Sequence, residues 1–209
     1  MRGNEKEAVR AALDVSRETM ARLEHYAALL EKWNAAINLV SRASLADLWA
    51  RHILDSAQIF ALCPEGARSW ADLGSGGGFP GLVVAILAHE AAPDLEVTLV
   101  ESDTRKAAFL ATAARELGLN VAVKAERIEA LAPQAADVVS ARALAPLTEL
   151  LGFAARHLAP KGRALFLKGA TFPQERAAAL AHWSFDVQTY PSKTDAEGVI
   201  LSIGDIAHA

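Results

Sequence analysis

The sequence predicts an α/β fold, in which a mostly parallel sheet with an antiparallel end carries helices on both faces and follows an N-terminal helical extension. From Ser69 onward, apolar runs of strand length alternate with helical patterns, as in folds built from βαβ units. Only a short turn-rich stretch, Pro191 to Gly198, separates the last two strand-like runs, which favours an antiparallel pair. We therefore expect a helical extension over residues 1–64 and an α/β core over residues 65–209, together forming one compact unit.

The extension is expected to contain two main helices. The first is indicated by apolar residues at helical spacing, namely Leu23, Tyr26, Leu30, Trp33 and Ile37. Among these, we interpret Tyr26 and Trp33 as core residues rather than as platforms for stacked bases. The second helix is expected from about Ser44 to Ala61, because Ser44 and Asp47 form a capping-box pattern. The stretch Cys63 to Gly66 then ends it.

In the core, the same patterns locate each element along the chain. The expected strands are Ser69–Leu73, Glu96–Val100, Val121–Lys124, Asp137–Ser140, Ala164–Lys168, Phe185–Tyr190 and Val199–Ile203. The expected helices are Pro80–His89, Lys106–Leu117, Leu147–Leu158 and Pro173–Ala181. Gly118 is expected to end the second of these helices, and Pro160 with Gly162 the third.

Composition and charge narrow the class of protein. The chain has 209 residues, and no apolar run reaches the roughly 20 residues that a membrane span needs. Its single cysteine, Cys63, cannot form an internal disulfide or a cysteine-based metal site, so we expect a cytoplasmic protein without a metal. The net charge of −4 argues against a surface that is basic throughout, although a local basic patch could still contact phosphates.

A glycine-rich loop from Gly74 to Gly81 follows the first expected strand and opens the next helix. Glycines let the backbone approach a ligand closely, and a helix start offers free N–H groups. The segment from Gly76 to Gly81 matches the G-x-G-x-x-G pattern, and Glu101 follows at about the 20-residue distance of a ribose-binding acid. Both a dinucleotide and S-adenosylmethionine are therefore candidate ligands.

Two residues favour S-adenosylmethionine. The carboxylate of Asp72, directly before the loop, would repel a pyrophosphate and attract the cationic amino group of the methionine part, directly or through water. Pro80 removes one of the N–H donors that a pyrophosphate would use. Asp72, Gly74, Gly76 and Gly78 are therefore candidate cofactor-binding residues, and a dehydrogenase that uses an NAD-type dinucleotide remains the alternative.

The sequence also narrows the methyl acceptor. Methyltransferases that act on exocyclic amines often carry a Pro-Pro-aromatic loop, and this chain has no Pro-Pro pair. Those that methylate a cytosine carbon need a nucleophilic cysteine, but Cys63 lies outside the expected core. An acceptor that is already nucleophilic, such as a ring nitrogen, remains, and for it the enzyme supplies mainly proximity and alignment. A small-molecule acceptor stays open as an alternative.

Five motifs occur in order along the chain. They are Lys32-Trp33-Asn34-x-x-Ile37-Asn38-Leu39-x-Ser41, Arg51-His52-x-x-Asp55-Ser56, the loop from Asp72 to Gly81, Ser140-x-Arg142-Ala143 and Leu167-Lys168-Gly169. From about Leu23 to Ile203, the sequence resembles the bacterial 16S rRNA guanine-N7 methyltransferase family, known as RsmG or glucose-inhibited division protein B. The resemblance implies a class I S-adenosylmethionine-dependent methyltransferase fold with a Rossmann-like sheet. It also implies methyl transfer to N7 of guanine 527, in the 530 loop of the 16S rRNA of the small ribosomal subunit.

The same resemblance implies contacts with the cofactor. Gly74 and Phe79 would touch it, and Glu101 would hold its ribose hydroxyls. Ile128 and Glu129 would border the adenine through a main-chain amide and a side chain.

Two cationic residues are the candidates for the acceptor side. The resemblance places Arg142 at the methyl-transfer site, next to both cofactor and RNA. An arginine there also suits phosphate or guanine O6 recognition, whereas its structural alternative is a surface salt bridge. Lys168, at the end of the fifth expected strand, is a second candidate for RNA contact, because ligands bind at the carboxyl ends of such strands.

Arg51, His52 and Asp55 fall within one turn of the second expected helix. Arg51 and Asp55 have the spacing of an ordinary exposed ion pair, and an active-site role is an equal alternative. Methylation at N7 needs no base, so we interpret His52 and Asp55 as structural residues or as residues that shape the cofactor pocket.

Further cations could widen an RNA-facing patch, namely Lys32, Arg42, Arg105, Lys106 and Lys193. The family often carries an arginine just before the last strand, but here that stretch, Asp195 to Gly198, contains no cation, which puts RNA contact through this loop in doubt. A monomer is the expected oligomeric state.

Overall fold

The computed structural model describes residues 2–209 and contains one seven-stranded sheet. The strand order across the sheet is β3 (Val121–Lys124), β2 (Glu96–Val100), β1 (Ser69–Leu73), β4 (Ala136–Arg142), β5 (Leu158–Lys168), β7 (Val199–His208) and β6 (Trp183–Pro191). The first five strands in this order are parallel, and β7 is antiparallel to both β5 and β6. The expected sheet with an antiparallel end is therefore confirmed.

The bounds of β1, β2 and β3 agree with those expected from the sequence, whereas the later strands are longer. β4 continues to Arg142, so this residue ends the strand rather than following it. Pro160 and Gly162 lie inside β5 and do not separate it from the preceding helix. Parallel pairing brings the carboxyl ends of β1, β2 and β4 to one edge, because Asp72 is in register with Ser140 and Leu73 with Val100.

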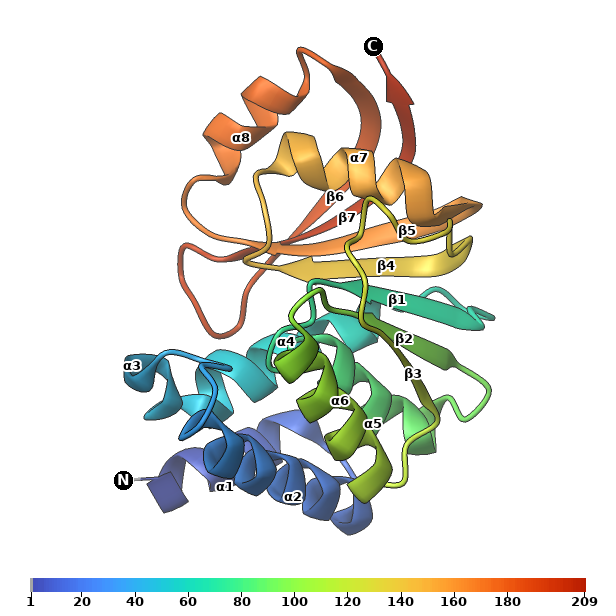
Figure 1. Cartoon of the computed structure of the whole chain (residues 1–209). Coiled ribbons are helices and arrows are strands. Elements are labelled where there is room, and N and C mark those ends of the chain that lie inside the picture. The colour runs from blue at the N-terminus through green and yellow to red at the C-terminus, as the bar shows by residue number, and fades with distance from the viewer. Residues whose placement is uncertain (1) are drawn as a thin grey trace.

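Helices cover both faces of the sheet (Figure 1), as expected for alternating strands and helices. One face packs against α2 (Arg17–Asn34), α5 (Gly81–Ala91) and α6 (Thr104–Glu116) around a core that includes Trp70 of β1. The other face packs against α7 (Leu147–His157) and α8 (Phe172–Ala179) around Ala71 and its neighbours. Successive residues of β1 therefore supply two different cores.

The N-terminal region begins with α1 (Arg2–Leu13), and it shares one apolar core with α5 and α6. Leu23 and Tyr26 are fully buried, and the ring of Trp33 packs 5.7 Å from that of Phe109, so the core interpretation of Tyr26 and Trp33 is confirmed. In the part of the chain that the structure describes, no helix is both long and apolar enough to cross a membrane.

The single helix expected from Ser44 to Ala61 is wrong. The segment forms four short pieces: α3 (Arg42–Leu45), the π-helix η1 (Trp49–Leu54), α4 (Asp55–Ala57) and the 3₁₀ turn η2 (Gln58–Leu62). The capping residue is Ser41, whose side chain accepts a hydrogen bond from the Ser44 backbone N–H at 3.1 Å. Single π turns within helices are rare, and those that do occur are often found at functional sites.

Candidate functional site

A cavity of about 540 Å³ opens at the carboxyl ends of β1, β2 and β4. Its walls come from the glycine loop, from the ends of β2 and β4, from residues 126–129 after β3 and from Leu39 and Val40 after α2. The volume lies in the range of roughly 300–1,000 Å³ that is usual for small-molecule and cofactor sites. Of the expected cofactor residues, it is lined by Gly74, Gly76, Phe79, Glu101, Ile128, Glu129 and Arg142.

The glycine loop forms the floor of this cavity. Gly74 has a φ of +65°, so a side chain there would be strained, and a Cβ would lie 2.5 Å from Cδ1 of Leu144, which would have to shift. Below the loop, the buried hydroxyl of Tyr26 donates a hydrogen bond to the Gly77 carbonyl at 2.6 Å. Gly78 packs against Leu82 and Tyr26 and does not line the cavity, so its predicted cofactor contact has no counterpart in this geometry.

Asp72 lies beneath the loop, and its side chain is completely buried. Its Oδ1 accepts a hydrogen bond from the Ser140 hydroxyl at 2.6 Å, and its Oδ2 accepts one from the Gly81 backbone N–H at 3.1 Å. Burial raises the pKa of Asp72 to about 6, although these hydrogen bonds oppose the shift. Asp72 does not line the cavity, which corrects the expectation of a direct contact with the methionine amino group.

The position of Asp72 also explains why a pyrophosphate would not bind at the start of α5. The helix begins at Gly81, after the cis Phe79–Pro80 peptide, and its first N–H points to the Asp72 carboxylate. An anion would need that N–H and would meet the carboxylate instead. The G-x-G-x-x-G match is therefore not a dinucleotide site.

Glu101, at the end of β2, has an exposed fraction of only 8% and lines the cavity. Its Oε2 accepts a hydrogen bond from the Gly76 backbone N–H and its Oε1 accepts one from the Asp103 N–H, both at 2.8 Å. Each carboxylate oxygen keeps lone-pair capacity, because an ionised carboxylate can accept about four hydrogen bonds. The side chain is thus fixed against the loop and is still able to accept hydrogen bonds from ribose hydroxyls.

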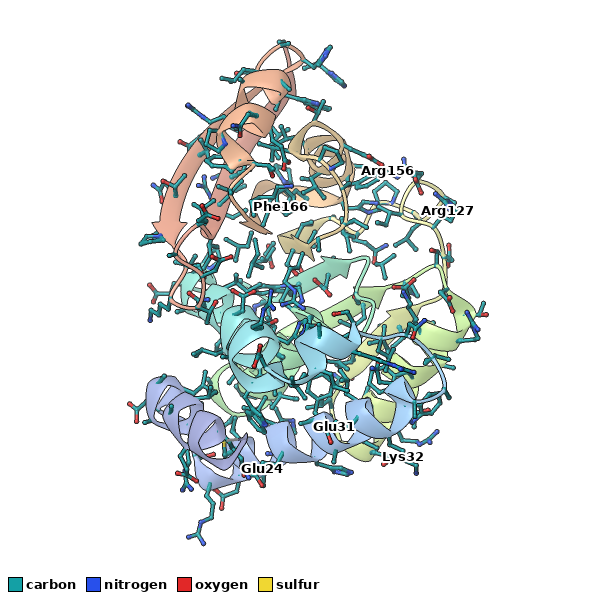
Figure 2. The ribbon with its side chains drawn as sticks, turned by 90° about the vertical axis from the view of Figure 1, so that its left-hand side faces the viewer. Glu24, Glu31, Lys32, Arg127, Arg156 and Phe166 are labelled. Atoms are coloured by element: carbon teal, nitrogen blue, oxygen red, sulfur yellow. The ribbon has the colours of Figure 1, made fainter. Side chains whose placement is uncertain are left out.

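The segment after β3 forms the opposite wall. Ile128 is nearly buried, and its carbonyl oxygen is 3.0 Å from the buried Nε2 of His157, which fixes the backbone at this point. The side chain of Glu129 is half exposed and pairs with Arg127 at 3.3 Å. Figure 2 shows Arg127 at the edge of the molecule. The wall thus offers an apolar side chain at Ile128 and a carboxylate at the rim.

Arg142 projects from the end of β4, and its side chain is largely buried. Nη1 donates hydrogen bonds to the Arg51 carbonyl at 3.0 Å and to Oδ2 of Asp55 at 3.3 Å, while Nη2 contacts Nδ1 of His52. The guanidinium carbon lies 5.0 Å from the centre of the Phe79 ring. Burial lowers the pKa of Arg142, and the Asp55 carboxylate opposes this shift. Arg142 thus forms a salt bridge, but the pair is largely buried at the cavity wall and is not the exposed surface pair of the alternative.

His52 is held in a neutral form by this arrangement. A guanidinium can only donate, so Nδ1 of His52 must be the acceptor and the proton must sit on Nε2. Burial and the adjacent charges of Arg142 and Arg51 lower the pKa of His52 to about 4. Its ring packs 4.9 Å from that of Phe79. His52 is consequently a packing and positioning group in the cavity wall, with no free lone pair for use as a base.

Asp55 pairs with Arg142 rather than with Arg51, so the exposed helix pair is not the one that forms, and an active-site role of Asp55 stays a prediction. Its other oxygen, Oδ1, accepts hydrogen bonds from the Thr194 hydroxyl at 2.7 Å and from Nε2 of Gln58 at 3.2 Å. Thr194 lies in the loop between β6 and β7, which descends toward α4 in Figure 1. Asp55 therefore connects the arginine to this loop.

Lys168 lies at the end of β5 with its ammonium already paired. Nζ is 2.6 Å from Oε2 of Glu175 and donates a hydrogen bond to the Ala145 carbonyl at 3.2 Å. Its side chain is only 12% exposed, so RNA contact through Lys168 stays a prediction and would require a change of partner. Among the other candidate cations, Lys106 lines the cavity, whereas Lys32 lies on α2 beside Glu31 (Figure 2).

Comparison with known sequences gives one consistent family. The model of the family described as "GidB: rRNA small subunit methyltransferase G" matches residues 19–199. A ribosomal RNA small subunit methyltransferase G from Cereibacter sphaeroides is 55% identical over 200 residues, covering 96% of each chain. Its namesake from a Ruegeria species is 56% identical over 191 residues, covering 91% of this chain and 93% of the relative.

Solved structures share the fold at low sequence identity. A TehB-like S-adenosylmethionine-dependent methyltransferase from Corynebacterium glutamicum superposes with a TM-score of 0.56 at 18% identity, covering 88% of this chain and 98% of its own. The 16S rRNA methylase RmtB gives a TM-score of 0.55 at 17% identity, covering 91% of this chain and 75% of its own. The sheet is therefore that of the class I S-adenosylmethionine-dependent methyltransferases.

Proposed function

Because the chain belongs to the rRNA small subunit methyltransferase G family, we propose that it methylates N7 of guanine 527, in the 530 loop of 16S rRNA. It is an S-adenosylmethionine-dependent rRNA methyltransferase, so the dehydrogenase and small-molecule alternatives are set aside. The proposal includes the choice of base and atom, the action of a monomer on the small ribosomal subunit and a cytoplasmic location.

The cavity at the carboxyl ends of the strands fits S-adenosylmethionine. Gly74 has a positive φ that disfavours a side chain, Glu101 has acceptor capacity for ribose hydroxyls, and Ile128 offers an apolar surface for adenine. Arg142 and Phe79 line the same cavity on the side of His52. When bound, the cofactor supplies an electrophilic methyl group on a sulfonium, and the C–S bonding pair stays on sulfur as the methyl group leaves.

Two observations support a ring nitrogen as the acceptor. N7 of guanine carries no proton, so no base has to remove one. On the Arg142 side of the cavity, neither His52 nor Asp72 can serve as a base, because Nδ1 of His52 is occupied by Arg142 and the Asp72 carboxylate lies outside the cavity; Glu101, the buried carboxylate that does line it, is assigned to the ribose. The chain therefore contributes mainly alignment of the acceptor lone pair with the methyl group.

The observation that carries the proposal is the position of Arg142. Its guanidinium lines the cofactor cavity and also a second, smaller cavity beside it. Arg142 can thus donate a hydrogen bond to O6 of a guanine, the group next to N7 on the base edge. The Asp55 carboxylate balances the charge of the Arg142 guanidinium, so the Arg142–Asp55 pair stays close to neutral while positive charge passes from sulfur to the base.

The test is methyl transfer to small subunits from a bacterial strain that lacks the enzyme. We expect labelled methyl groups from the cofactor to appear on 16S rRNA and chain cleavage specific for 7-methylguanosine to map them to position 527. Arg142→Ala should abolish the signal, whereas Arg176→Ala, at an exposed position on α8, should leave it unchanged. Labelling of another nucleotide or of another atom of the same guanine would contradict the proposal.

A further inference from the structure

A second cavity of about 240 Å³ adjoins the cofactor cavity and shares Arg142 and Ala143 with it. Its other walls are the end of β5 with the residues that follow and the loop between β6 and β7. The volume is below the roughly 300–1,000 Å³ of pockets for drug-sized ligands, so it suits a single small ring system. Because the two cavities share a wall, a ring in the smaller one would lie next to the methyl-transfer position.

The polar groups of this cavity form an ordered pair. Nη1 of Arg142 and Oδ2 of Asp55 are 3.3 Å apart, and the two side chains are 16% and 17% exposed. A hydrogen-bond donor therefore stands directly beside a hydrogen-bond acceptor at the cavity wall. Guanine presents the complementary order, because its O6 accepts and the adjacent N1–H donates. Adenine presents the reverse order, with an N6 amino donor next to an N1 acceptor.

We propose that this second cavity receives the target guanine, turned out of its stack, and that Asp55 recognises its N1–H while Arg142 donates to O6. The inference deepens the proposed function and rests on it. Enzymes that act on a base commonly take it out of the stack and read it by hydrogen bonds to its Watson–Crick edge. With O6 held at the shared wall, the neighbouring N7 faces the cofactor cavity.

The hydrogen bonds of Asp55 leave one of its two oxygens able to accept from the N1–H of guanine. Thr194 and Gln58 both donate to Oδ1, so Oδ2 is left with Arg142 and one further lone-pair position. Asp55 is therefore held through Oδ1 by the β6–β7 loop and by Gln58 of η2, and Oδ2 remains the oxygen that can accept from a base.

The charges of the cavity favour a base over a phosphate. The ammonium of Lys168, which also lines it, is paired with Glu175. Asp195 adds a second carboxylate to the lining. A phosphate would be repelled by the two carboxylates, whereas the N1–H and amino donors of guanine would be attracted.

The experiment compares base analogues at the target position. Small subunits are reconstituted with 16S rRNA ligated to carry guanosine, inosine or N1-methylguanosine at position 527, and initial methylation rates are measured with the wild-type protein. All three nucleosides keep O6 and N7, and only N1-methylguanosine lacks the N1–H. We expect inosine to react at a rate comparable to that of guanosine, and N1-methylguanosine to react roughly tenfold more slowly or worse.

The variant Asp55→Asn separates recognition from positioning. Thr194 and Gln58 both donate to the Oδ1 position, so they should hold the amide oxygen there and leave a donor in place of the acceptor Oδ2. If Asp55 reads N1–H, the rate ratio of guanosine to N1-methylguanosine should therefore fall toward one, while affinity for S-adenosylhomocysteine stays unchanged because Asp55 does not line the cofactor cavity. A purely structural role would slow both substrates by the same factor. Asp186→Asn, which removes an exposed carboxylate paired with Arg163, is the matched control and should keep the wild-type ratio.

The outcomes distinguish the two levels of the proposal. Equal wild-type rates on guanosine and N1-methylguanosine would overturn the assignment of Asp55 and leave the proposed function intact, even if Asp55→Asn did not fold. No methyl group on the guanosine particle would contradict the proposed function, and this inference with it.

Discussion

Arg142 is fixed through both terminal nitrogens of its guanidinium: Nη1 donates to the Arg51 carbonyl and to Asp55, Nη2 contacts His52, and the Phe79 ring lies near the guanidinium carbon. Such a fork cannot be reproduced by the single ammonium of a lysine. Misplacement of a reacting group by about 1 Å can cost roughly 100-fold in rate. The arginine is therefore expected to matter for alignment more than for cofactor affinity.

We expect Arg142→Lys to lower the methylation rate by about 100-fold while the affinity for S-adenosylhomocysteine changes by a small factor. Calorimetric titration measures the affinity, and single-turnover transfer to small subunits measures the rate. An equal loss in both would show that Arg142 mainly binds the cofactor, and an unchanged rate would remove it from the transfer step.

His52 and Asp72 should give the free energy of unfolding opposite pH dependences. The pKa of His52 is lowered from 6.5 to about 4, so as pH falls through this range the unfolded state takes up a proton first and stability is lost. The pKa of Asp72 is raised from 3.8 to about 6, so as pH rises through this range the unfolded state loses its proton first and stability is again lost. Between about pH 4 and 6 the two contributions oppose each other.

Single substitutions should separate these two contributions. In His52→Asn, whose amide oxygen can accept from Arg142, stability should decline more steeply with rising pH than in the wild type. In Asp72→Asn it should rise more steeply, although the amide has only one acceptor oxygen for the Gly81 N–H and the Ser140 hydroxyl and the protein will be less stable. Urea unfolding at pH 4.5, 5.5 and 6.5 measures both, and slopes equal to the wild type would contradict the two pKa shifts.

At the scale of elements, the start of α5 is packed directly against β1 and β2. A Cβ at Gly81 would lie 2.6 Å from Oδ2 of Asp72 and would also meet Leu99, so this glycine allows the helix to begin where it does. Gly152, in the middle of α7, would give a Cβ only an ordinary contact of 3.6 Å with Trp183. The two glycines thus differ in what an added methyl group would meet.

Gly81→Ala should destabilise the protein by about 1–3 kcal/mol, the usual cost of overpacking. Gly152→Ala should instead stabilise it by about 0.5–1 kcal/mol, because alanine is the better residue inside a helix. Urea unfolding compares both with the wild type. If Gly81→Ala left stability unchanged or raised it, the close packing at the start of α5 would be in error; if Gly152→Ala destabilised the protein, the open space at that position would be.

Elements with strong local patterns were predictable, and those that depend on distant contacts were not. β1, β2 and β3 have the expected bounds because each is a short apolar run between clear breaks. The segment from Ser44 to Ala61 has a helical pattern, but the π turn at Trp49–Leu54 interrupts the α-helix and was not predicted. That turn is fixed by tertiary contacts, among them the hydrogen bond from Arg142 to the Arg51 carbonyl.

In the candidate site, too, features set by local sequence spacing were predictable and contacts between distant residues were not. The glycine loop and Glu101 follow from spacing within one βαβ unit, because a carboxylate after the second strand faces the loop after the first. Sequence spacing could not show that Asp55 pairs with Arg142, 87 residues away, or that Ser140 holds the Asp72 carboxylate. Asp55 and Ser140 both belong to motifs that resemble the family, and this resemblance was the one feature of the sequence that drew attention to them.

At the scale of the whole molecule, only ligands that bind the folded state should stabilise it. We expect S-adenosylhomocysteine to raise the melting temperature, since a ligand at 100 times its Kd adds about 2.7 kcal/mol. NAD should give no shift, because the first N–H of α5 is taken by Asp72. Thermal unfolding with each ligand measures this, and stabilisation by NAD alone would contradict the cofactor assignment.

The most direct test of the central claim is an experimental structure of the protein with S-adenosylhomocysteine. We predict that the ribose will lie at Glu101, the adenine at Ile128 and the sulfur toward the wall that Arg142 shares with the second cavity. A ligand bound elsewhere, for example in the cavity of about 550 Å³ between the N-terminal helices and α5, would contradict the account. So would a sulfur directed away from Arg142.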